Sequence, residues 1–189
     1  MRWEGWSPGR AALEALDIGT ENCNVSKLPA WVAMNPGIRL LLHNLDQAFD
    51  ARAWHGTPLA LALRGLTARQ ALWRPAPGRH NIWEILLHTA YWKYLVRRRL
   101  TGDADSFPHP GANWPRLPSP TDERALAADV KLLRQQHSLL VRAVTRFPAK
   151  RLRRRRARWN PLEEILGIAS HDLYHCGQIQ LLKRLYPHP

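Results

Sequence analysis

The sequence predicts an all-α protein, a bundle of four long helices with one long crossover loop. Four long segments place apolar residues at helical spacing. No segment alternates apolar and polar residues with the period of two that is typical of strands. The loop between the second and third helical segments, residues 102–120, is long enough to travel the length of a bundle. We therefore expect the second and third helices to run parallel.

The first two helices are predicted from their apolar faces and their end residues. The first begins near Ile38 and carries an apolar stripe as far as Phe49. The second begins at Asn81, with Glu84 three residues later, which is typical of a capping box. It runs without a helix-breaking residue to Gly102.

The third and fourth helices are predicted in the same way. The third begins at Thr121 and stops at Pro148. Its apolar seam consists of Leu126, Val130, Leu133, Leu140, Val144 and Phe147. The fourth begins at Asn160, with proline at its first position and an acid at its third, and ends near Tyr186.

The chain divides into a short N-terminal part and one domain. Residues 1–33 lack sustained periodicity and are followed by Met34. We expect them to be a loosely ordered extension, or an upstream reading of a start at Met34. Residues 34–186 are predicted to form the helical domain, because a chain of 189 residues is long enough to bury a core without disulfides.

The net charge of +13 is concentrated rather than spread over the chain. Residues 150–158 contain seven of the positive charges. They could contact nucleic acid, but they lack the interleaved aromatic residues of single-strand binders and match no recognition motif. We favour a solvated turn between helices and expect no nucleic-acid partner.

The N-terminus has no apolar signal segment, and no apolar run approaches the roughly 20 residues that span a bilayer. Cys23 and Cys176 have no CxxC partners, so a reducing compartment is the simpler interpretation. The sequence thus predicts a soluble, cytoplasmic protein that does not contact a membrane.

A histidine pair four residues apart lies in the last helix, within SHDLYHCGQIQLLKR. His171 and His175 share one helix face, and that face continues through Ile168 and Ile179 toward the bundle interior. Nine histidines in the chain give about 0.4 such pairs by chance, so the spacing alone is weak support. The inward position carries more weight, because an unpaired buried imidazole costs a few kcal/mol.

The second helix offers a third imidazole. His88 shares a stripe with Ile85 and Trp92 and should also face the core. Three protein ligands with remaining positions open are typical of catalytic metal sites. Nitrogen ligands suit Zn, Ni, Cu or Fe. The alternative is that these are separate core histidines with their own hydrogen bonds.

Further residues are weaker candidates for the same pocket. His137 lies on the third helix's apolar seam, although a hydrogen-bonded core histidine is the favoured interpretation there. Glu84 could accept a hydrogen bond from a metal ligand or act as a base, but its capping role already explains it. His55 follows a helix end and could cover a pocket mouth or make a turn, and Trp92 suggests a partly apolar substrate.

Two segments, RHNIWEILLHTAYW and SHDLYHCGQIQLLKRL, resemble the DinB/YfiT-like family of metalloenzymes. The resemblance covers roughly residues 35–186. It implies a four-helix bundle of up-down-down-up connection, and one divalent metal ion, usually zinc or nickel, held by His88, His171 and His175. Gln178 matches the family pattern as well, and we interpret it as a packing residue or a partner of a ligand.

The resemblance also limits the function without fixing it. Relatives include transferases that join low-molecular-weight thiols to electrophiles, a maleylpyruvate isomerase and hydrolases. We expect a metal-dependent transferase or hydrolase with a small-molecule substrate, such as a low-molecular-weight thiol. The alternatives are a non-catalytic metal-binding or sensor module and, less favoured, nucleic-acid binding through the arginine-rich turn. A homodimer is compatible with so many aromatic residues, but no sequence feature specifies one.

Overall fold

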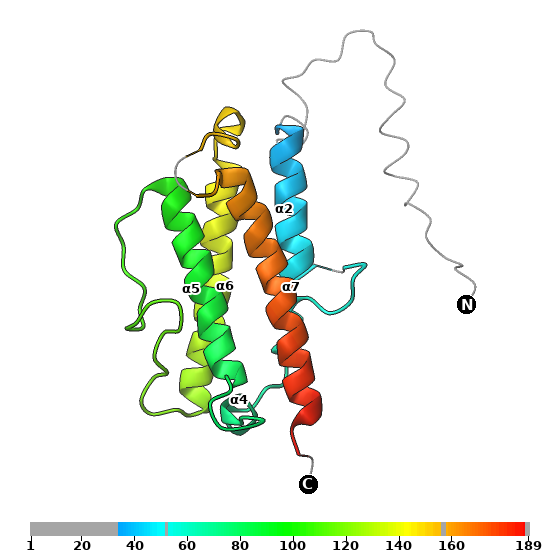
Figure 1. Ribbon diagram of the computed structural model, residues 1–189, viewed down its shortest axis with the longest axis vertical. Coiled ribbons are helices and arrows are strands. Elements are labelled where there is room, and N and C mark those ends of the chain that lie inside the picture. Colours follow the sequence, from blue (N-terminus) through cyan, green and yellow to red (C-terminus); the bar gives the residue numbers. More distant parts are fainter. Residues whose placement is uncertain (1–33, 52, 156–157, 188–189) are drawn as a thin grey trace, which may run out of the picture. The chain divides into compact units, whose positions relative to one another are not determined.

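The computed structural model describes residues 34–51, 53–155 and 158–187. Six α-helices and one 3-10 helix make up the regular structure of these residues, which contain no strand beyond one isolated bridge (Figure 1). The all-α prediction is confirmed. From Asn35 onward the described residues belong to one compact unit. The expectations for residues 1–33 lie outside the described residues.

Four of the helices are 14 to 25 residues long. They are α2 (Pro36–Phe49), α5 (Ile82–Thr101), α6 (Glu123–Thr145) and α7 (Pro161–Leu185). Three short elements join them: α3 (Leu59–Ala62), α4 (Ala68–Leu72) and the 3-10 helix η3 (Ala149–Arg151). None of the helices in the described ranges is long and apolar enough to cross a membrane.

The predicted caps explain where the long helices begin and end. Asn81 and Asn160 each form a complete capping box, the first with Glu84 and the second with Glu163. At the other end of α5, Gly102 adopts the left-handed conformation, with φ of 82°, that commonly ends a helix.

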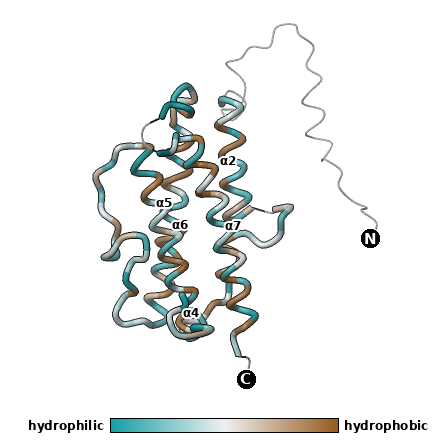
Figure 2. Tube along the Cα trace, in the orientation of Figure 1, coloured by the Kyte–Doolittle hydropathy of each residue, from teal (hydrophilic) through white to brown (hydrophobic). Residues whose placement is uncertain are grey.

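The long helices pack in a definite order. α5 contacts α6 and α7, while α2 contacts α7 and α6. Figure 1 shows that α5 and α6 run in the same direction and that α2 and α7 run in the opposite one. Apolar and polar residues recur along each long helix, as the hydropathy colours of Figure 2 show. The buried faces include the large side chains of Trp83, Leu86, Leu133, Ile165 and Ile179.

The crossover segment between α5 and α6 is attached to the helices by side chains. The Tyr94 hydroxyl donates to the Asp105 carbonyl oxygen at 2.7 Å. The His109 ring bonds to the buried Asp129 carboxylate at 2.7 Å, and Trp83 donates its indole N–H to the same carboxylate. These attachments hold the loop against α5 and α6, which matters for the histidine cluster described next.

Candidate metal centre

Three histidine rings converge between the middle of α5 and the middle of α7. The Nε2 atom of His88 lies 3.0 Å from Nε2 of His171, and that atom lies 3.1 Å from Nε2 of His175. All three nitrogens lie within 4.8 Å of one another. His88 and His175 are buried and His171 is half-buried. The sequence placed these rings on inward faces, and the structure brings them together.

The spacing of the three nitrogens fits ligands of a single ion. In a tetrahedral zinc site with Zn–N bonds of about 2.0–2.1 Å, neighbouring ligand nitrogens lie about 3.3 Å apart. The two Nε2 separations of 3.0 and 3.1 Å are close to that value.

The hydrogen bonds on the far sides of two rings assign their protons. Nδ1 of His88 lies 2.6 Å from the carbonyl oxygen of Asn113, and it must donate because a carbonyl only accepts. Nδ1 of His175 lies 2.6 Å from Oε1 of Gln178 and donates in the same way. A neutral imidazole has one N–H, so each Nε2 directs a lone pair into the cluster.

The third ring cannot satisfy both of these lone pairs. A neutral His171 can donate one proton from Nε2, which serves only one of the two neighbours. Its Nδ1 is buried and has no hydrogen-bond partner among the residues that the structure describes. Mutual hydrogen bonding therefore leaves ring nitrogens without partners, whereas one cation would accept all three Nε2 lone pairs. The donor set fits a metal ion better than three separate core histidines.

Burial keeps these rings in the neutral form that binds metals. It lowers the pKa of His88 to about 4, outweighing the hydrogen bond to Asn113, which raises the pKa, and the charges of His175 and His80 make smaller lowering contributions. Burial lowers the pKa of His171 to about 3, assisted by the two neighbouring histidines. The pKa of His175 is lowered as well, again mainly by burial. Protons therefore compete weakly for these nitrogens near neutral pH.

A cavity of about 1130 Å³ opens onto the cluster. Its walls include the aromatic side chains of Trp92, Trp114, Trp159 and Tyr174. Its polar lining residues besides the histidines include Arg79, Arg99, Glu163, Glu164 and Gln178, although most of the exposed lining surface is apolar. An apolar cavity with a few convergent polar groups is the usual form of a small-molecule site.

The sequence model of the DinB superfamily matches residues 52–179. The chain belongs to the DinB superfamily. The matched range contains all three histidines of the cluster and most of the cavity. No curated protein and no solved structure matches the chain.

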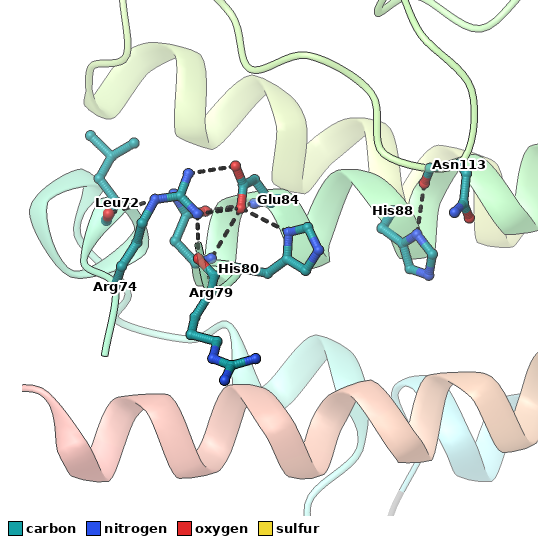
Figure 3. Close-up of polar contacts among 8 residues, drawn as sticks. Leu72, Arg74, Arg79, His80, Glu84, His88 and Asn113 are labelled. Carbon is teal, nitrogen blue, oxygen red and sulfur yellow. Dashed lines mark hydrogen bonds and ion pairs between the residues drawn. The ribbon is translucent and has the colours of Figure 1, made fainter. Parts of the chain in front are cut away.

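Two loop residues of this DinB-superfamily protein complete the cluster, and the sequence did not reveal them. The Trp114 ring stacks on the His88 ring with centroids 3.9 Å apart. Asn113, in the left-handed conformation with φ of 62°, presents its carbonyl oxygen to His88 and accepts the Trp92 indole N–H on its side chain. Figure 3 shows Asn113 lying over the His88 ring. Both residues belong to an aperiodic, proline-rich loop, so no spacing linked them to the second helix.

A second network lies on the same cavity wall (Figure 3). Nδ1 of His80 lies 3.1 Å from Oε2 of Glu84, and Arg74 contacts both oxygens of that carboxylate, at 2.7 and 2.5 Å. Burial raises the pKa of Glu84, but hydrogen bonds from Arg74, Asn81 and His80 outweigh it and the net shift is downward. Glu84 is therefore ionised and orients the His80 ring, which also stacks on Trp114 with centroids 3.6 Å apart.

The remaining candidates divide into two groups. Gln178 and Trp92 lie at the cluster, as the hydrogen bonds above show. Glu84 does not contact the cluster itself but contacts His80. His137 and His55 do not reach it. His137 stacks on Phe49 at 3.8 Å, because its part of the α6 seam faces α2 rather than the cavity. His55 bonds to the Gln47 carbonyl at 3.1 Å and lines a different hollow, beside α2. Neither residue covers the mouth of the cavity.

A buried ion pair lies behind the cluster. Lys93 and Asp172 are both fully buried, and the lysine Nζ contacts Oδ2 of the aspartate. Nδ1 of His137 lies 3.4 Å from the same Nζ. Burial raises the pKa of Asp172 to about 6, against the opposing effect of Lys93. The pair joins α5 to α7 within two turns of His88 and directly beside His171.

Proposed function

We propose that this DinB-superfamily protein is a metal-dependent enzyme in which His88, His171 and His175 hold one divalent ion, zinc or nickel. The observation that carries the proposal is the convergence of three Nε2 lone pairs at the base of a large, mainly apolar cavity. The reaction class that we favour is transfer of a small thiol to an electrophile, or hydrolysis. A cytoplasmic location is proposed with it, because the described Cys176 is a free thiol buried in the helical unit.

When bound, a divalent ion supplies Lewis-acid chemistry, lowering the pKa of a thiol or water that reaches it. The chain's own residues set the conditions for this. Asn113 and Gln178 hold the rings of His88 and His175 with Nε2 directed inward. Trp114 covers one face of His88 and excludes water from it.

His80 is the residue best placed to accept a proton from the substrate. Its Nδ1 is engaged by Glu84, so its Nε2 keeps a lone pair, and the ring lines the cavity. Figure 3 shows the ring between Glu84 and His88. The imidazole–carboxylate arrangement holds the ring in one tautomer, with the Nε2 lone pair free to accept a proton, as a general base requires.

We further propose that the four long helices form an up-down-down-up bundle. Two observations support this connection order: the shared direction of α5 and α6, and the long segment that joins them. The helix contacts are compatible with it, since each long helix contacts at least two others. The order places the histidines of α5 and α7 on facing surfaces.

Elemental analysis of purified protein tests the proposal. We expect about one equivalent of zinc or nickel in the wild type, and its loss in His171→Ala. Because affinity resins can supply nickel, the protein should be purified without a histidine tag. Absence of metal from the wild type, even after incubation with zinc and with nickel, would refute the site.

Catalysis is tested separately, by a screen of low-molecular-weight thiols with electrophiles and of ester substrates. Product that forms with the wild type and not with His171→Ala supports an enzyme. Metal binding without turnover of any substrate in the screen favours the non-catalytic metal-binding module instead.

A further inference from the structure

Two arginine-rich segments that lie far apart in the sequence meet at one end of the helical unit. One is the last turn of α5, and the other extends from the last turn of α6 through η3. Figure 1 shows the C-terminal ends of α5 and α6 at the same end as η3. Between them is a pocket of about 340 Å³, lined in part by Arg97, Arg142, Arg146 and Arg151.

One of the four arginines is a fixed part of the pocket. The side chain of Arg97 is 5% exposed and donates to Asp103 at 2.6 Å and to Asp105. Its Nε is buried without a hydrogen-bond partner in the described part of the chain. Arg97 is therefore held in one orientation at the base of the pocket, and because Asp103 and Asp105 balance its charge, the charge available to a ligand comes from the other three arginines.

The other three arginines are exposed and held by no acid. Arg142 lies in the last turn of α6, Arg146 is the C-cap of that helix, and Arg151 ends η3. No hydrogen bond or ion pair of their guanidinium groups is found within residues 34–51, 53–155 and 158–187. Guanidinium groups without acidic partners around one hollow leave their donors available to an anion.

The negative ends of the two helices offset only part of the positive charge of the arginines. A helix C-terminus carries about half a negative charge, so α5 and α6 together contribute about one. Adding Asp103 and Asp105 still leaves the four arginines with a surplus of about one positive charge. The exposed Lys150, together with the arginines at 153–155, follows directly and increases it. Dipole compensation therefore does not explain why so many cations gather here.

We propose that this pocket binds a small anion that carries a phosphate or pyrophosphate group. Guanidinium groups present paired N–H donors that match phosphate oxygens, and each such contact is charge-assisted. The volume of about 340 Å³ suits a group of this size and lies at the low end for ligand sites. A nucleic-acid strand is a poorer fit, because the hollow is short and has no row of aromatic side chains for stacking bases.

The pocket is separate from the histidine cavity. The two hollows share no lining residue. The anion site therefore stands even if the metal centre is absent, and it can be tested independently.

Calorimetric titration of the full chain with inorganic pyrophosphate tests the site. We expect saturable binding that weakens about tenfold or more in Arg142→Gln/Arg146→Gln, because two charge-assisted contacts are removed. Arg151→Gln, on a different element, should also weaken it. The matched control is Arg69→Gln/Arg124→Gln, which removes the same charge from exposed positions outside the pocket and should change affinity less than about twofold.

Two further arms identify the source of the phosphate and exclude the metal centre. Vesicles of phosphatidylcholine, with and without phosphatidic acid, are sedimented with the same proteins to test a lipid headgroup. Because pyrophosphate also chelates metals, binding at the metal centre has to be excluded. The variant His171→Ala provides this control and should bind pyrophosphate as the wild type does. Loss of binding of either probe in the pocket variants, but not in the control, supports the proposal. The probe that binds shows whether the phosphate belongs to a free small molecule or to a lipid headgroup. No binding of either probe, equal weakening in the control, or loss in His171→Ala would overturn it.

Discussion

At the level of single residues, a substitution of His80 tests catalysis without removing a metal ligand. His80→Gln removes the proposed proton acceptor but leaves the three clustered histidines unchanged. We expect the rate of any reaction found in the substrate screen to fall about 10²- to 10⁴-fold, the usual contribution of a general base. Metal content should stay at the wild-type level.

The exposed His43 provides a matched control for that variant. His43→Gln makes the same chemical change on α2, outside the cavity, and should leave the rate unaltered. An unchanged rate in His80→Gln would show that the proton leaves by another route.

Buried neutral histidines also give the metal-free protein a defined pH dependence. The pKa of His137 is lowered to about 3 by burial, with Lys93 contributing, whereas in the unfolded chain it is about 6.5. Between these values the unfolded state binds a proton that the folded state does not. The contribution of neutral His137 to the free energy of unfolding is therefore fully present above about pH 6.5. It decreases as the pH falls, by up to about 1.4 kcal/mol per pH unit.

Urea unfolding of the chelator-treated wild type and of His137→Phe, from pH 7 to pH 4.5, measures this dependence. The difference between the two proteins isolates the one histidine from the carboxylates, which they share. We expect the stability of the variant to decrease less with acidification. Parallel curves would contradict the neutral, buried state of His137.

At the level of elements, the crossover loop supports His88 through Asn113 and Trp114. Trp114→Ala removes the ring that lies between His80 and His88. We expect metal affinity to fall about 10- to 100-fold, as it does when groups that orient metal ligands are lost. Competition with a chromophoric chelator measures this affinity.

Trp159 is the matched control, because it lines the same cavity without a ring contact to any of the three clustered histidines among the described residues. Trp159→Ala should leave metal affinity within about twofold of the wild type. If both variants lose affinity equally, general loosening of the cavity is the cause rather than support of His88.

The elements that could be predicted from the sequence are those with local physical signatures. The capping residues Asn81 and Asn160 mark helix starts through contacts with residues three positions away, so their effect is visible in a short window. The inward faces of His88, His171 and His175 follow from helical periodicity alone. Both predictions use only the local sequence, so they do not depend on how the helices pack against one another.

The residues that could not be predicted depend on contacts across the fold. Asn113 and Trp114 reach His88 only because His109 and other loop residues attach the loop to the helices, and an aperiodic loop has no pattern that reveals this. His137 shows a limit of prediction from periodicity. Periodicity placed it correctly on a buried face, but a face does not specify which neighbour it meets, and here that neighbour is Phe49.

For the whole molecule, the cluster should couple metal binding to stability. An ion held by α5 and α7 binds the folded chain and not the unfolded one. At a free concentration of about 100 times Kd it adds about 2.7 kcal/mol. For a chain of this size that corresponds to an increase in Tm of roughly 5–10 °C.

Calorimetric scans with and without a chelator measure the shift. We expect removal of the ion to lower the Tm of the wild type and to leave that of His171→Ala unchanged. A chelator effect of equal size in both proteins would place the stabilising ion elsewhere.

The buried contact between Lys93 and Asp172 has a consequence for how this protein can change over time. Loss of either partner leaves a charge stranded in the core at a cost of about 3–5 kcal/mol, whereas an apolar pair of similar size is often tolerated. A lineage can therefore exchange these two positions only together, or in quick succession. Descendants that share the histidine cluster should carry either both charges or neither, and a chain with just one of them should fold poorly.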